Sequence, residues 1–357
     1  MLEQNVNLED KTILVTGAAG FIGANLILQL LRTVERVRIV GIDNMNDYYD
    51  VSLKEFRLGQ IRELADAVSG AFVFVKGSIA DRDVVREIFG QYRPHVVVNL
   101  AAQAGVRYSI ENPDAYIESN LIGFYNILEA CRHSYDNGAT GVGHLVYASS
   151  SSVYGSNRKI PYATEDKVDN PVSLYAATKK SDELLAHAYA KLYGIPSTGL
   201  RFFTVYGPAG RPDMAYFGFT DKLVKNETIK IFNYGNCRRD FTYIDDIVTG
   251  VQAVMRCAPL PNGDGVKYRI YNIGNNQPEN LLDFVEILQD ELKRAQILPA
   301  DYDFEAHKEL VGMQPGDVEV TYADVSELER DFGFKPSTDL RAGLRCFAQW
   351  YKAFYLS

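Results

Sequence analysis

A tyrosine and a lysine four residues apart are the pair of side chains best suited to acid–base chemistry. Tyr175 and Lys179 form the only Tyr-x-x-x-Lys in a chain with 23 tyrosines. On a helix, two such positions share one face. A free tyrosine has a pKa of about 10, but a neighbouring ammonium group favours the phenolate. On its own such a pair is typical of a solvated helix face; with further motifs it predicts a base that removes a hydroxyl proton.

A row of four serines follows a short apolar run in the middle of the chain. The run HLVY at 144–147 is typical of a buried strand, and Ser149 to Ser152 come close behind it. Hydroxyl groups add little to a hydrophobic core, so a strand that ends on them indicates a site. In a doubly wound sheet, ligands bind beyond the carboxyl ends of the strands. One of these serines can therefore share a substrate hydroxyl with the Tyr175 phenolate.

A glycine-rich turn near the start of the chain predicts a dinucleotide site. The sequence GAAGFIG at 17–23 lies between an apolar strand at 12–15 and a helical pattern at 22–31. Glycines let the backbone approach a pyrophosphate, which then faces the N–H groups at the helix amino terminus. Asp43 lies 20 residues after Gly23, where a carboxylate can accept a ribose hydroxyl. An acid there favours NAD over NADP, although Asp43 alone could also be a strand-end turn residue.

Short apolar runs alternate with longer helical patterns over about the first 200 residues, which predicts an α/β protein. Continuous Val- and Ile-rich strands separated by helices indicate a parallel sheet that is buried on both faces. The predicted strands are 12–15, 37–42, 72–75, 95–100, 144–147 and 198–203, and the predicted helices are 22–31, 84–89, 115–133 and 174–193. After Phe203, Gly, Pro and Tyr become frequent. We predict a nucleotide-binding domain of residues 1–204 with 238–275 returning to it, and a smaller mixed α/β substrate lobe of 205–237 and 276–357.

Together, the glycine turn, the serine row and Tyr-x-x-x-Lys resemble the extended short-chain dehydrogenase/reductases of the NAD-dependent epimerase/dehydratase family. The resemblance covers almost the whole chain and implies a doubly wound parallel Rossmann sheet with tightly held NAD. Four further stretches are similar to the UDP-glucuronate 4-epimerases of this family: DNMNDYYD at 43–50, AAQAGVRYS at 101–109, RFFTVYGP at 201–208 and MQPGD at 313–317. The implied substrate is a UDP-uronic acid.

The resemblance also implies roles for individual residues. Tyr175 would be the catalytic base, and Lys179 its partner and a ribose ligand. Ser150 corresponds to the catalytic Ser or Thr of the family by its spacing to Tyr175. The implied cofactor-binding residues are Gly17, Gly20, Phe21, Ile22, Gly23, Asp43, Asn44, Ser78, Ile79, Leu100, Ala101, Ala102, Asn120, Tyr175, Lys179 and Phe203.

The same resemblance extends to the nucleotide end of the substrate. Arg239 matches a nucleotide-phosphate ligand, and Gln314 and Asp317 match the uridine end. Two positions depart from the family pattern. Ser78 stands where many relatives carry Asp as an adenine contact, which bears on adenine affinity rather than on the class of cofactor. Ala209 stands where close relatives usually carry Trp, which bears on the shape of the pocket wall.

The predicted reaction inverts C4 of a UDP-sugar through a transient 4-keto sugar. In UDP-glucuronate, a ketone at C4 and a carboxylate on C5 make a β-keto acid that can lose carbon dioxide. An epimerase must therefore hold the carboxylate so that its C–C bond does not overlap the carbonyl π system. Thr204, Ser151 and Ser152 are small donors suited to holding it. Arg211 could assist as a cation, or equally bind a phosphate or form a loop salt bridge.

Other chemistries on this fold need other residues. A 4,6-dehydratase needs an Asp–Glu pair where Ser151 and Ser152 stand, and decarboxylases of this branch usually carry Glu at the position of Ser152. Epimerisation of neutral or N-acetylated UDP-hexoses and decarboxylation of UDP-glucuronate stay open as alternatives, because sequence does not show pocket size. A non-catalytic NAD-sensing protein would be expected to lack Tyr175 or Lys179, and both are present.

Composition narrows the partners and the location. The 357 residues carry a formal net charge of −9, with a pI near 5.2, so we expect no nucleic-acid partner. No apolar run approaches the roughly 20 residues of a membrane span, and the amino terminus does not resemble a signal peptide. Four cysteines without C-x-x-C are typical of reduced thiols in the cytoplasm, and five histidines without ligand spacing predict no metal. Helices 115–133 and 174–193 carry apolar residues on more than one face, which permits a homodimer.

Overall fold

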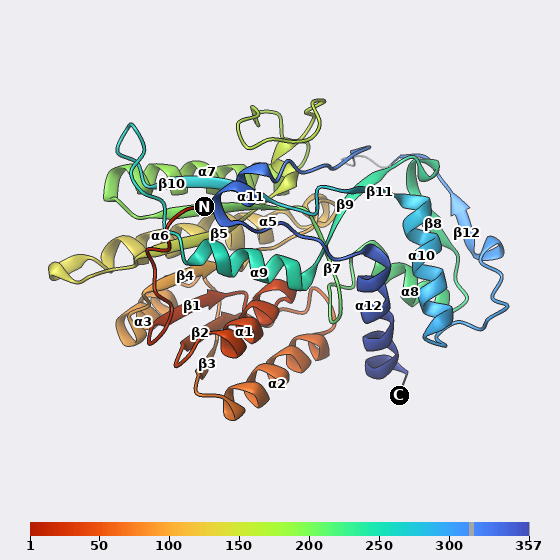
Figure 1. Ribbon diagram of the computed structural model, residues 1–357, viewed down its shortest axis with the longest axis horizontal. Helices are drawn as coiled ribbons and strands as arrows, with labels where there is room; N and C mark the ends of the chain where they lie inside the picture. The colour runs from red at the N-terminus through yellow and green to blue at the C-terminus, as the bar shows by residue number, and fades with distance from the viewer. Residues whose placement is uncertain (314–317, 357) are drawn as a thin grey trace.

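One large parallel sheet forms the centre of the structure, a computed structural model that describes residues 1–313 and 318–356 (Figure 1). Its order is β10-β6-β5-β4-β1-β2-β3, and every neighbouring pair is parallel. The strands are β1 (Thr12–Thr16), β2 (Arg38–Asp43), β3 (Ala71–Lys76), β4 (Val96–Asn99), β5 (His144–Ser150), β6 (Ser197–Phe202) and β10 (Tyr268–Ile273). The strand order reverses between β1 and β4, which is where ligands bind in such sheets. The predicted doubly wound α/β sheet is confirmed.

Helices cover both faces of this sheet (Figure 1). One apolar layer joins the sheet to α1 (Phe21–Thr33), α2 (Val51–Ala67) and α9 (Ile244–Met255). The opposite layer joins it to α3 (Arg82–Tyr92), α6 (Gly123–His133) and α7 (Leu174–Tyr193). Every residue of β1, β4 and β6 is buried, because neither face of these strands meets solvent. That double covering explains why the central residues of β1 and β4 form continuous apolar runs rather than alternating with polar residues.

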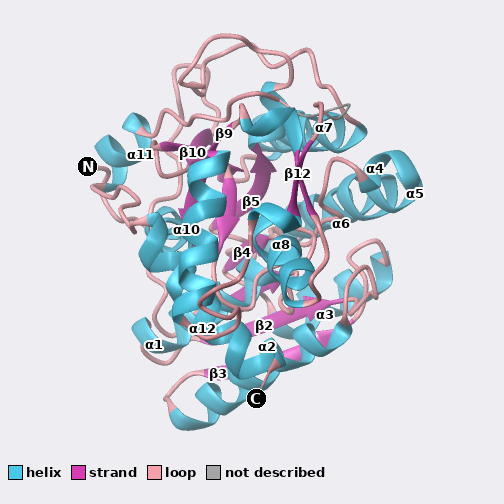
Figure 2. Cartoon of the chain, turned by 90° about the vertical axis from the view of Figure 1, so that its right-hand side faces the viewer, coloured by secondary structure: helices cyan, strands magenta, loops and turns pink. Residues whose placement is uncertain are grey.

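A smaller mixed lobe stands beside the carboxyl edge of the sheet (Figures 1 and 2). A three-stranded sheet has the order β11-β9-β7, and β8 pairs with β12 in a second, two-stranded sheet. These strands are β7 (Thr204–Tyr206), β8 (Ile229–Ile231), β9 (Arg238–Tyr243), β11 (Pro278–Asn280) and β12 (Lys308–Leu310). The helices beside them are α8 (Ala215–Val224), α10 (Leu281–Arg294) and α12 (Leu340–Tyr355). The short α11 (Ser326–Phe332) lies against β10 of the large sheet.

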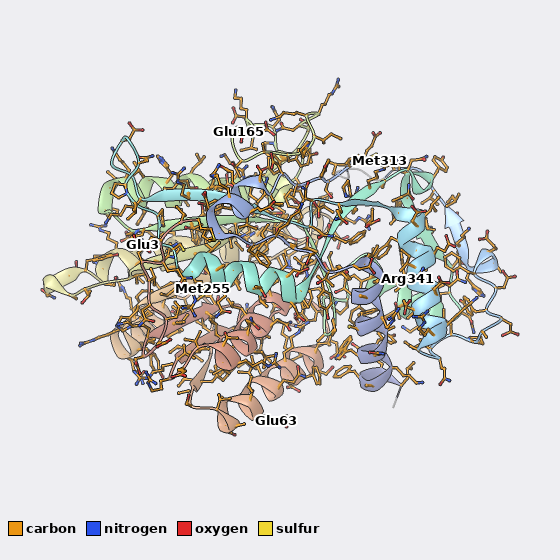
Figure 3. The ribbon with its side chains drawn as sticks, viewed as in Figure 1. Glu3, Glu63, Glu165, Met255, Met313 and Arg341 are labelled. Atoms are coloured by element: carbon orange, nitrogen blue, oxygen red, sulfur yellow. The ribbon has the colours of Figure 1, made fainter. Side chains whose placement is uncertain are left out.

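A buried acid fastens the two long helices of the smaller lobe together. Glu291 on α10 is 1% exposed, and Arg341 on α12 donates to its Oε1 over 3.2 Å. Arg345, one turn further along α12, donates to its other oxygen over 3.0 Å. Figure 3 shows Arg341 between the two helices. The lobe is therefore joined by charge as well as by its apolar core.

Residues 238–275 were expected to return to the large sheet, but only part of this stretch does so. β10 pairs with β6 over residues 268–273, so this segment does return. Residues 238–243 form β9 of the three-stranded sheet instead, because they pair with β7 and β11. The following helix α9 packs on α1 and covers the large sheet. The division of the chain into two domains stays a prediction.

The long helix predicted at 115–133 contains a π-helical turn. The structure places α4 (Tyr108–Glu111) and α5 (Pro113–Tyr116) first, then the π turn η1 (Ile117–Ile122) and then α6. A π turn holds one more residue than an α turn, and such turns are frequent at functional sites. Here Asn120, which is 1% exposed, bonds to Gln103 and to Thr178 of α7.

The described chain offers neither a membrane span nor a metal centre. No helix in residues 1–313 or 318–356 combines the length and the apolar character needed to cross a membrane. Within the same residues, no group of three or more His, Cys, Asp or Glu side chains is placed to hold a metal ion.

A buried histidine on β5 couples the stability of the sheet to pH. His144 is fully buried, and its ring nitrogens lie 2.8 Å from Thr198 Oγ1 and 3.2 Å from the Met255 carbonyl oxygen. Burial lowers the pKa of His144 to about 4, despite the bond to Met255. The unfolded chain binds this proton near pH 6.5, so the neutral ring stabilises the fold fully above that pH. The contribution is lost as the pH falls from about 6.5 through about 4.

We predict that His144→Asn flattens the pH dependence of stability in this range. The wild-type protein should lose about 2 kcal/mol of its free energy of unfolding through this residue between pH 7 and pH 5, and the variant should not. Urea denaturation at the two pH values measures the difference. His187→Asn, at an exposed position on α7, should keep the wild-type dependence. An equal loss in His144→Asn and wild type would contradict the prediction.

Candidate active site

The glycine turn between β1 and α1 leaves no room for side chains. Gly17 has a φ of 68°, and a Cβ there would lie 2.9 Å from the Ala101 nitrogen. A Cβ on Gly23 would lie 2.1 Å from the Gly17 carbonyl oxygen. The turn therefore presents bare backbone and the amino terminus of α1 to the carboxyl edge of the sheet. That is the arrangement that binds a pyrophosphate.

The predicted ribose acid also shapes this turn. Asp43 ends β2 and is 8% exposed. Its Oδ2 accepts from the Ala19 N–H over 3.1 Å, and its Oδ1 accepts from the Met45 N–H over 2.9 Å. Each oxygen keeps a further lone pair for a ribose hydroxyl. The residues at this edge thus fit the adenosine half of NAD.

The other predicted cofactor residues lie along the same edge because parallel strands end there together. Thr16 Oγ1, at the end of β1, accepts from the N–H groups of Leu100 and Ala101 after β4, which fixes the neighbouring strand ends. Ser78 Oγ, after β3, accepts from the Ala80 N–H. Three of the remaining predicted residues belong to the start of α1: Gly20 precedes the helix, and Phe21 and Ile22 begin it. Three others directly follow strands: Asn44 follows β2, Ala102 follows β4 and Phe203 follows β6. Ile79 lies against Gly123.

Two of the three predicted catalytic residues, Tyr175 and Lys179, lie in the first turns of α7. Ser173 caps this helix by accepting from the Ala176 N–H over 3.1 Å. Tyr175 is half-buried. Lys179 is 2% exposed, and its Nζ donates to the Ala148 carbonyl of β5 over 3.0 Å and to Asp182 Oδ2 over 3.1 Å. The lysine therefore ties the helix to the strand that ends on serines.

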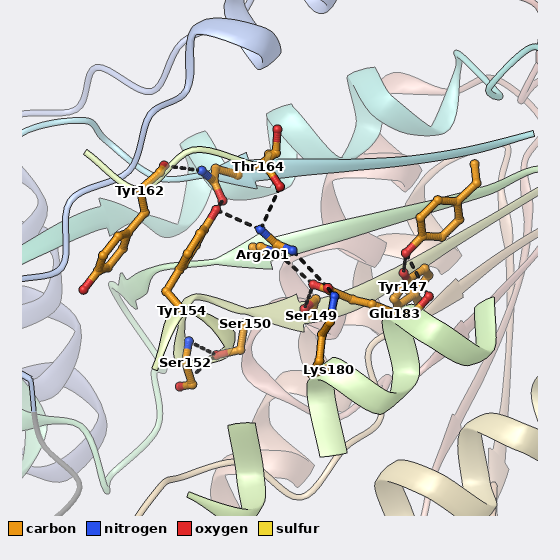
Figure 4. Close-up of polar contacts among 12 residues, drawn as sticks. Tyr147, Ser149, Ser150, Ser152, Tyr154, Tyr162, Thr164, Lys180, Glu183 and Arg201 are labelled. Carbon is orange, nitrogen blue, oxygen red and sulfur yellow. Dashed lines mark hydrogen bonds and ion pairs between the residues drawn. The ribbon is translucent and has the colours of Figure 1, made fainter. Parts of the chain in front are cut away.

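The serines at the end of β5 make two kinds of contact: one is buried against α7, and others bond to each other (Figure 4). Successive side chains of a strand point to opposite faces. Ser149 is buried, and its hydroxyl donates to Glu183 Oε1 over 2.7 Å. Ser150 Oγ accepts from the Ser152 N–H and donates to the Ser152 hydroxyl, both over 3.1 Å. Ser151 and Ser152 begin the short helix η3 (Ser151–Tyr154) and are half-buried. The serines that follow Ser149 thus form a cluster of hydroxyls at the strand end.

A buried ion pair lies beside these serines (Figure 4). Arg201 on β6 binds both oxygens of Glu183 on α7, over 2.8 and 3.0 Å, and the two side chains are 2% and 1% exposed. Burial alone would raise the pKa of Glu183, but Arg201, Lys180 and Ser149 together hold that pKa below its ordinary value. Glu183 is therefore ionised, and it joins α7, β5 and β6 at one point.

A row of tyrosine rings leads away from Tyr175, the predicted catalytic base. The ring of Tyr116 lies 6.0 Å from that of Tyr175, and Tyr108 and Tyr48 continue the row at 6.3 and 4.6 Å. Burial raises the pKa of Tyr116 and raises that of Tyr48 to about 12. These two neighbours therefore stay protonated at neutral pH and do not compete as bases.

A cavity of about 630 Å³ opens beside the tyrosine row. Its lining residues are Asn46, Asp47, Tyr48, Gln103, Arg107, Tyr108, Glu111, Asn112 and Ala115. Cavities of about 300 to 1,000 Å³ are typical of small-molecule sites. The lining combines aromatic faces with polar groups, which suits a polar ligand of that size.

The residues predicted to bind the substrate lie on several different segments of the chain. Arg211 binds Asp213 through both guanidinium nitrogens, over 3.0 and 2.5 Å, so it forms a loop salt bridge. Thr204 begins β7 and is half-buried. Arg239 Nη1 donates to the carbonyl groups of Arg238 and Glu319 over 3.0 and 3.1 Å. The predicted uridine ligands Gln314 and Asp317 lie outside the described residues.

One buried cation was missed by sequence reasoning. Arg57 on α2 is 1% exposed, and it donates to the Ala19 carbonyl of the glycine turn over 3.0 Å. It also donates to the carbonyls of Ala209 and Gly210 and to the Tyr49 hydroxyl, over 2.6 to 2.9 Å. Among the described residues, all of these acceptors are uncharged. Arg57 thus joins the nucleotide turn to the loop that carries Arg211, and no local motif distinguishes it from a surface arginine.

Comparison with known proteins shows the family to which the chain belongs. The sequence model of the GDP-mannose 4,6 dehydratase family matches residues 14–347. The chain belongs to this family. Its members are NAD-dependent epimerases and dehydratases, and the bare glycine turn and Asp43 fit that cofactor.

Relatives within the family cover almost the whole chain. Protein CapI of Staphylococcus aureus is 48% identical over 96% of this chain and 99% of its own length. UDP-glucuronate 4-epimerase 4 of Arabidopsis thaliana is 46% identical over 96% of this chain and 76% of its own length. Among solved structures, UDP-glucuronic acid 4-epimerase from Bacillus cereus, in complex with UDP-glucuronic acid and NAD, is 31% identical. It covers 96% of this chain and 100% of its own, with a TM-score of 0.81.

We predict that Arg57→Met weakens the binding of NAD at least tenfold. The change removes the bonds by which Arg57 links the glycine turn to the loop at 209–210, and bonds from a charged donor are worth about 1.5 to 3 kcal/mol each. Calorimetric titration of cofactor-stripped protein with NAD measures the effect. Arg57→Lys keeps the charge but not the planar fork, so it should fall between wild type and Arg57→Met. Arg36→Met, at an exposed ion pair with Asp10, is the matched control. Wild-type affinity in folded Arg57→Met would refute the prediction.

Proposed function

We propose that this protein interconverts UDP-glucuronate and UDP-galacturonate by inverting C4, with NAD held tightly throughout. The observation that carries the proposal is the bond from Lys179 of α7 to the Ala148 carbonyl of β5, which ties the helix turn after Tyr175 to the strand that ends on the bonded hydroxyls of Ser150 and Ser152. The likeness to the Bacillus cereus enzyme bound to UDP-glucuronic acid and NAD supports the choice of substrate. Ser151 and Ser152 support it further, because dehydration would need acids at these positions.

Each catalytic residue has one task in the proposed reaction. NAD supplies a hydride acceptor that later returns the hydride. Tyr175, as phenolate, removes the proton from the sugar 4-OH, and Ser150 bonds to the same oxygen. Lys179 favours the phenolate by its charge and is held in place by Ala148 and Asp182. With NAD bound, the sugar would turn over in the pocket and present its opposite face to the cofactor before Tyr175 returned the proton to the 4-oxygen.

Small hydroxyls hold the uronate carboxylate in this proposal. Ser151, Ser152 and Thr204 can donate to it and hold its C–C bond near the plane of the 4-keto group, where that bond does not overlap the carbonyl π system. Arg211 already binds both oxygens of Asp213, so its charge is compensated before any ligand arrives. We therefore assign the restraint of the carboxylate to the hydroxyls and leave Arg211 to the loop.

The test is incubation of the purified protein with UDP-glucuronate and no added NAD, followed by chromatography of the sugar nucleotides. UDP-galacturonate alone is expected, because the retained cofactor is regenerated in each cycle. Tyr175→Phe should lower the rate about 100-fold or more, as loss of a general base does. Tyr193→Phe, at an exposed position on the same helix, should not change it. A UDP-pentose with carbon dioxide, or turnover of UDP-glucose or its N-acetyl analogue alone, would overturn the assignment.

We also propose that a second copy of the chain is the partner. Several large apolar side chains are exposed on η1, α6 and α7: Ile117, Ile122, Tyr125, Leu184 and Leu192. Leu184 and Leu192 lie eight residues apart on one face of α7, and α6 and η1 pack beside this helix. Exposed apolar groups gathered on neighbouring helices suit a two-fold interface.

Light scattering should therefore give twice the chain mass of 40.0 kDa. Leu184→Glu should shift the mass toward the monomer, because it places a charge on the proposed interface. Leu260→Glu, at an exposed apolar position outside these helices, should leave the dimer intact. A monomeric wild-type protein would contradict the proposal.

We propose a cytoplasmic location as well. All four cysteines are free, and Cys131, Cys237 and Cys257 are buried. Unpaired thiols are typical of a reducing compartment.

A further inference from the structure

Asp182 is a buried acid next to the catalytic lysine, and the proposed reaction gives it no proton to transfer. It lies on α7 three residues after Lys179, and both side chains are 2% exposed. Its Oδ2 lies 3.1 Å from Lys179 Nζ. Its other oxygen, Oδ1, is buried and has no hydrogen-bond partner among the described residues. An unsatisfied carboxylate oxygen in a native site calls for an explanation.

The position of Asp182 gives it control over a charge that the chemistry needs. The ammonium group of Lys179 favours ionisation of Tyr175 because opposite charges attract strongly away from water. An ionised Asp182 in contact with that ammonium cancels much of its field. A protonated Asp182 leaves the field intact. The protonation state of Asp182 therefore changes how readily Tyr175 becomes a phenolate.

The surroundings of Asp182 make both protonation states accessible near neutral pH. Burial raises its pKa to about 7, although Lys179 pulls that pKa down; Glu183, the next residue, raises it further. The charge of Glu183 is taken up by Arg201 of β6 and by Lys180.

The other elements packed against this part of α7 contribute uncharged phenols. Tyr147 of β5 and Tyr268 of β10 bond to each other over 2.8 Å, and burial raises the pKa of both. Tyr116 precedes η1 and likewise stays protonated because burial raises its pKa. Lys179 is thus the one cation in contact with Asp182 among the described residues.

We propose that Asp182 is a positioning residue that holds Lys179 and, by gaining or losing a proton, sets the charge that Lys179 presents to Tyr175. The inference rests on the proposed function for its catalytic meaning, but the coupling of the three side chains does not depend on the substrate. At high pH, ionised Asp182 restrains the lysine and compensates its charge. As the pH falls, Asp182 takes up a proton, the lysine field is released and the Tyr175 phenolate persists to lower pH.

The test is a titration of Tyr175 in the NAD-bound protein, read from its ultraviolet absorbance as tyrosinate. Wild type and Asp182→Asn are each compared with the same protein carrying Tyr175→Phe, so the difference reports Tyr175 alone. Asparagine keeps the shape and an acceptor for Lys179 but carries no charge. We expect the apparent pKa of Tyr175 to fall by about one unit in Asp182→Asn, a tenfold change in its ionisation ratio. The acid limb of the rate on UDP-glucuronate should move to lower pH by the same amount.

Two further variants keep the outcome decisive. Glu118→Gln removes the same charge from an exposed position on η1 and should leave the titration unchanged. Asp182→Ser repeats the measurement with a smaller side chain, in case the amide disturbs folding. An unchanged Tyr175 titration in the folded variants overturns the proposal. A shifted titration without turnover of UDP-glucuronate supports the coupling and refutes the proposed substrate, so the two claims fail separately.

Discussion

The buried pair of Glu183 and Arg201 is the constraint on which the arrangement of the site depends. Both side chains are almost fully removed from water, and Arg201 binds both carboxylate oxygens. Loss of either partner of such a pair leaves an uncompensated charge and costs about 3 to 5 kcal/mol. The pair does more than stabilise, because its members lie on different elements. It fixes the position of α7 against β6, and Ser149 adds β5 to the same junction.

This junction fixes the direction in which the reactive groups point. Tyr175, Lys179 and Glu183 follow one another at intervals of four, so they share one face of α7. Once Glu183 is anchored, the rotation of the helix about its axis is set, and Lys179, one turn earlier, reaches the Ala148 carbonyl near the end of β5. The alternation of β5 completes the arrangement, since Ser149 points into the junction and the next residue faces the opposite way. The serine row thus contributes one side chain to the buried core and the following ones to the predicted site.

Sequence reasoning placed the local motifs on the correct strands and helices, but it missed contacts that depend on distant backbone. The glycine turn, Asp43 and Tyr-x-x-x-Lys could be located from spacing, because each motif lies within one strand–turn–helix unit or one helix. The π turn at Asn120 could not, since its composition is that of an ordinary helix. The bonds of Arg57 could not either: the carbonyls of Ala209 and Gly210 lie more than 150 residues away and become acceptors only in the folded chain. For Arg211, the sequence allowed a carboxylate ligand, a phosphate ligand or a loop salt bridge. The folded loop shows the salt bridge to Asp213.

Arg57 has a consequence for motion. Its guanidinium group is clamped between the turn that would hold the cofactor and the loop of the smaller lobe, so these two surfaces behave as one rigid wall. A hinge at this wall would have to expose a buried cation. In the proposed reaction, something must rotate between the first and second hydride transfers, and the wall is poorly suited to do so. We therefore expect the sugar to rotate about its link to the diphosphate, while this wall keeps its position.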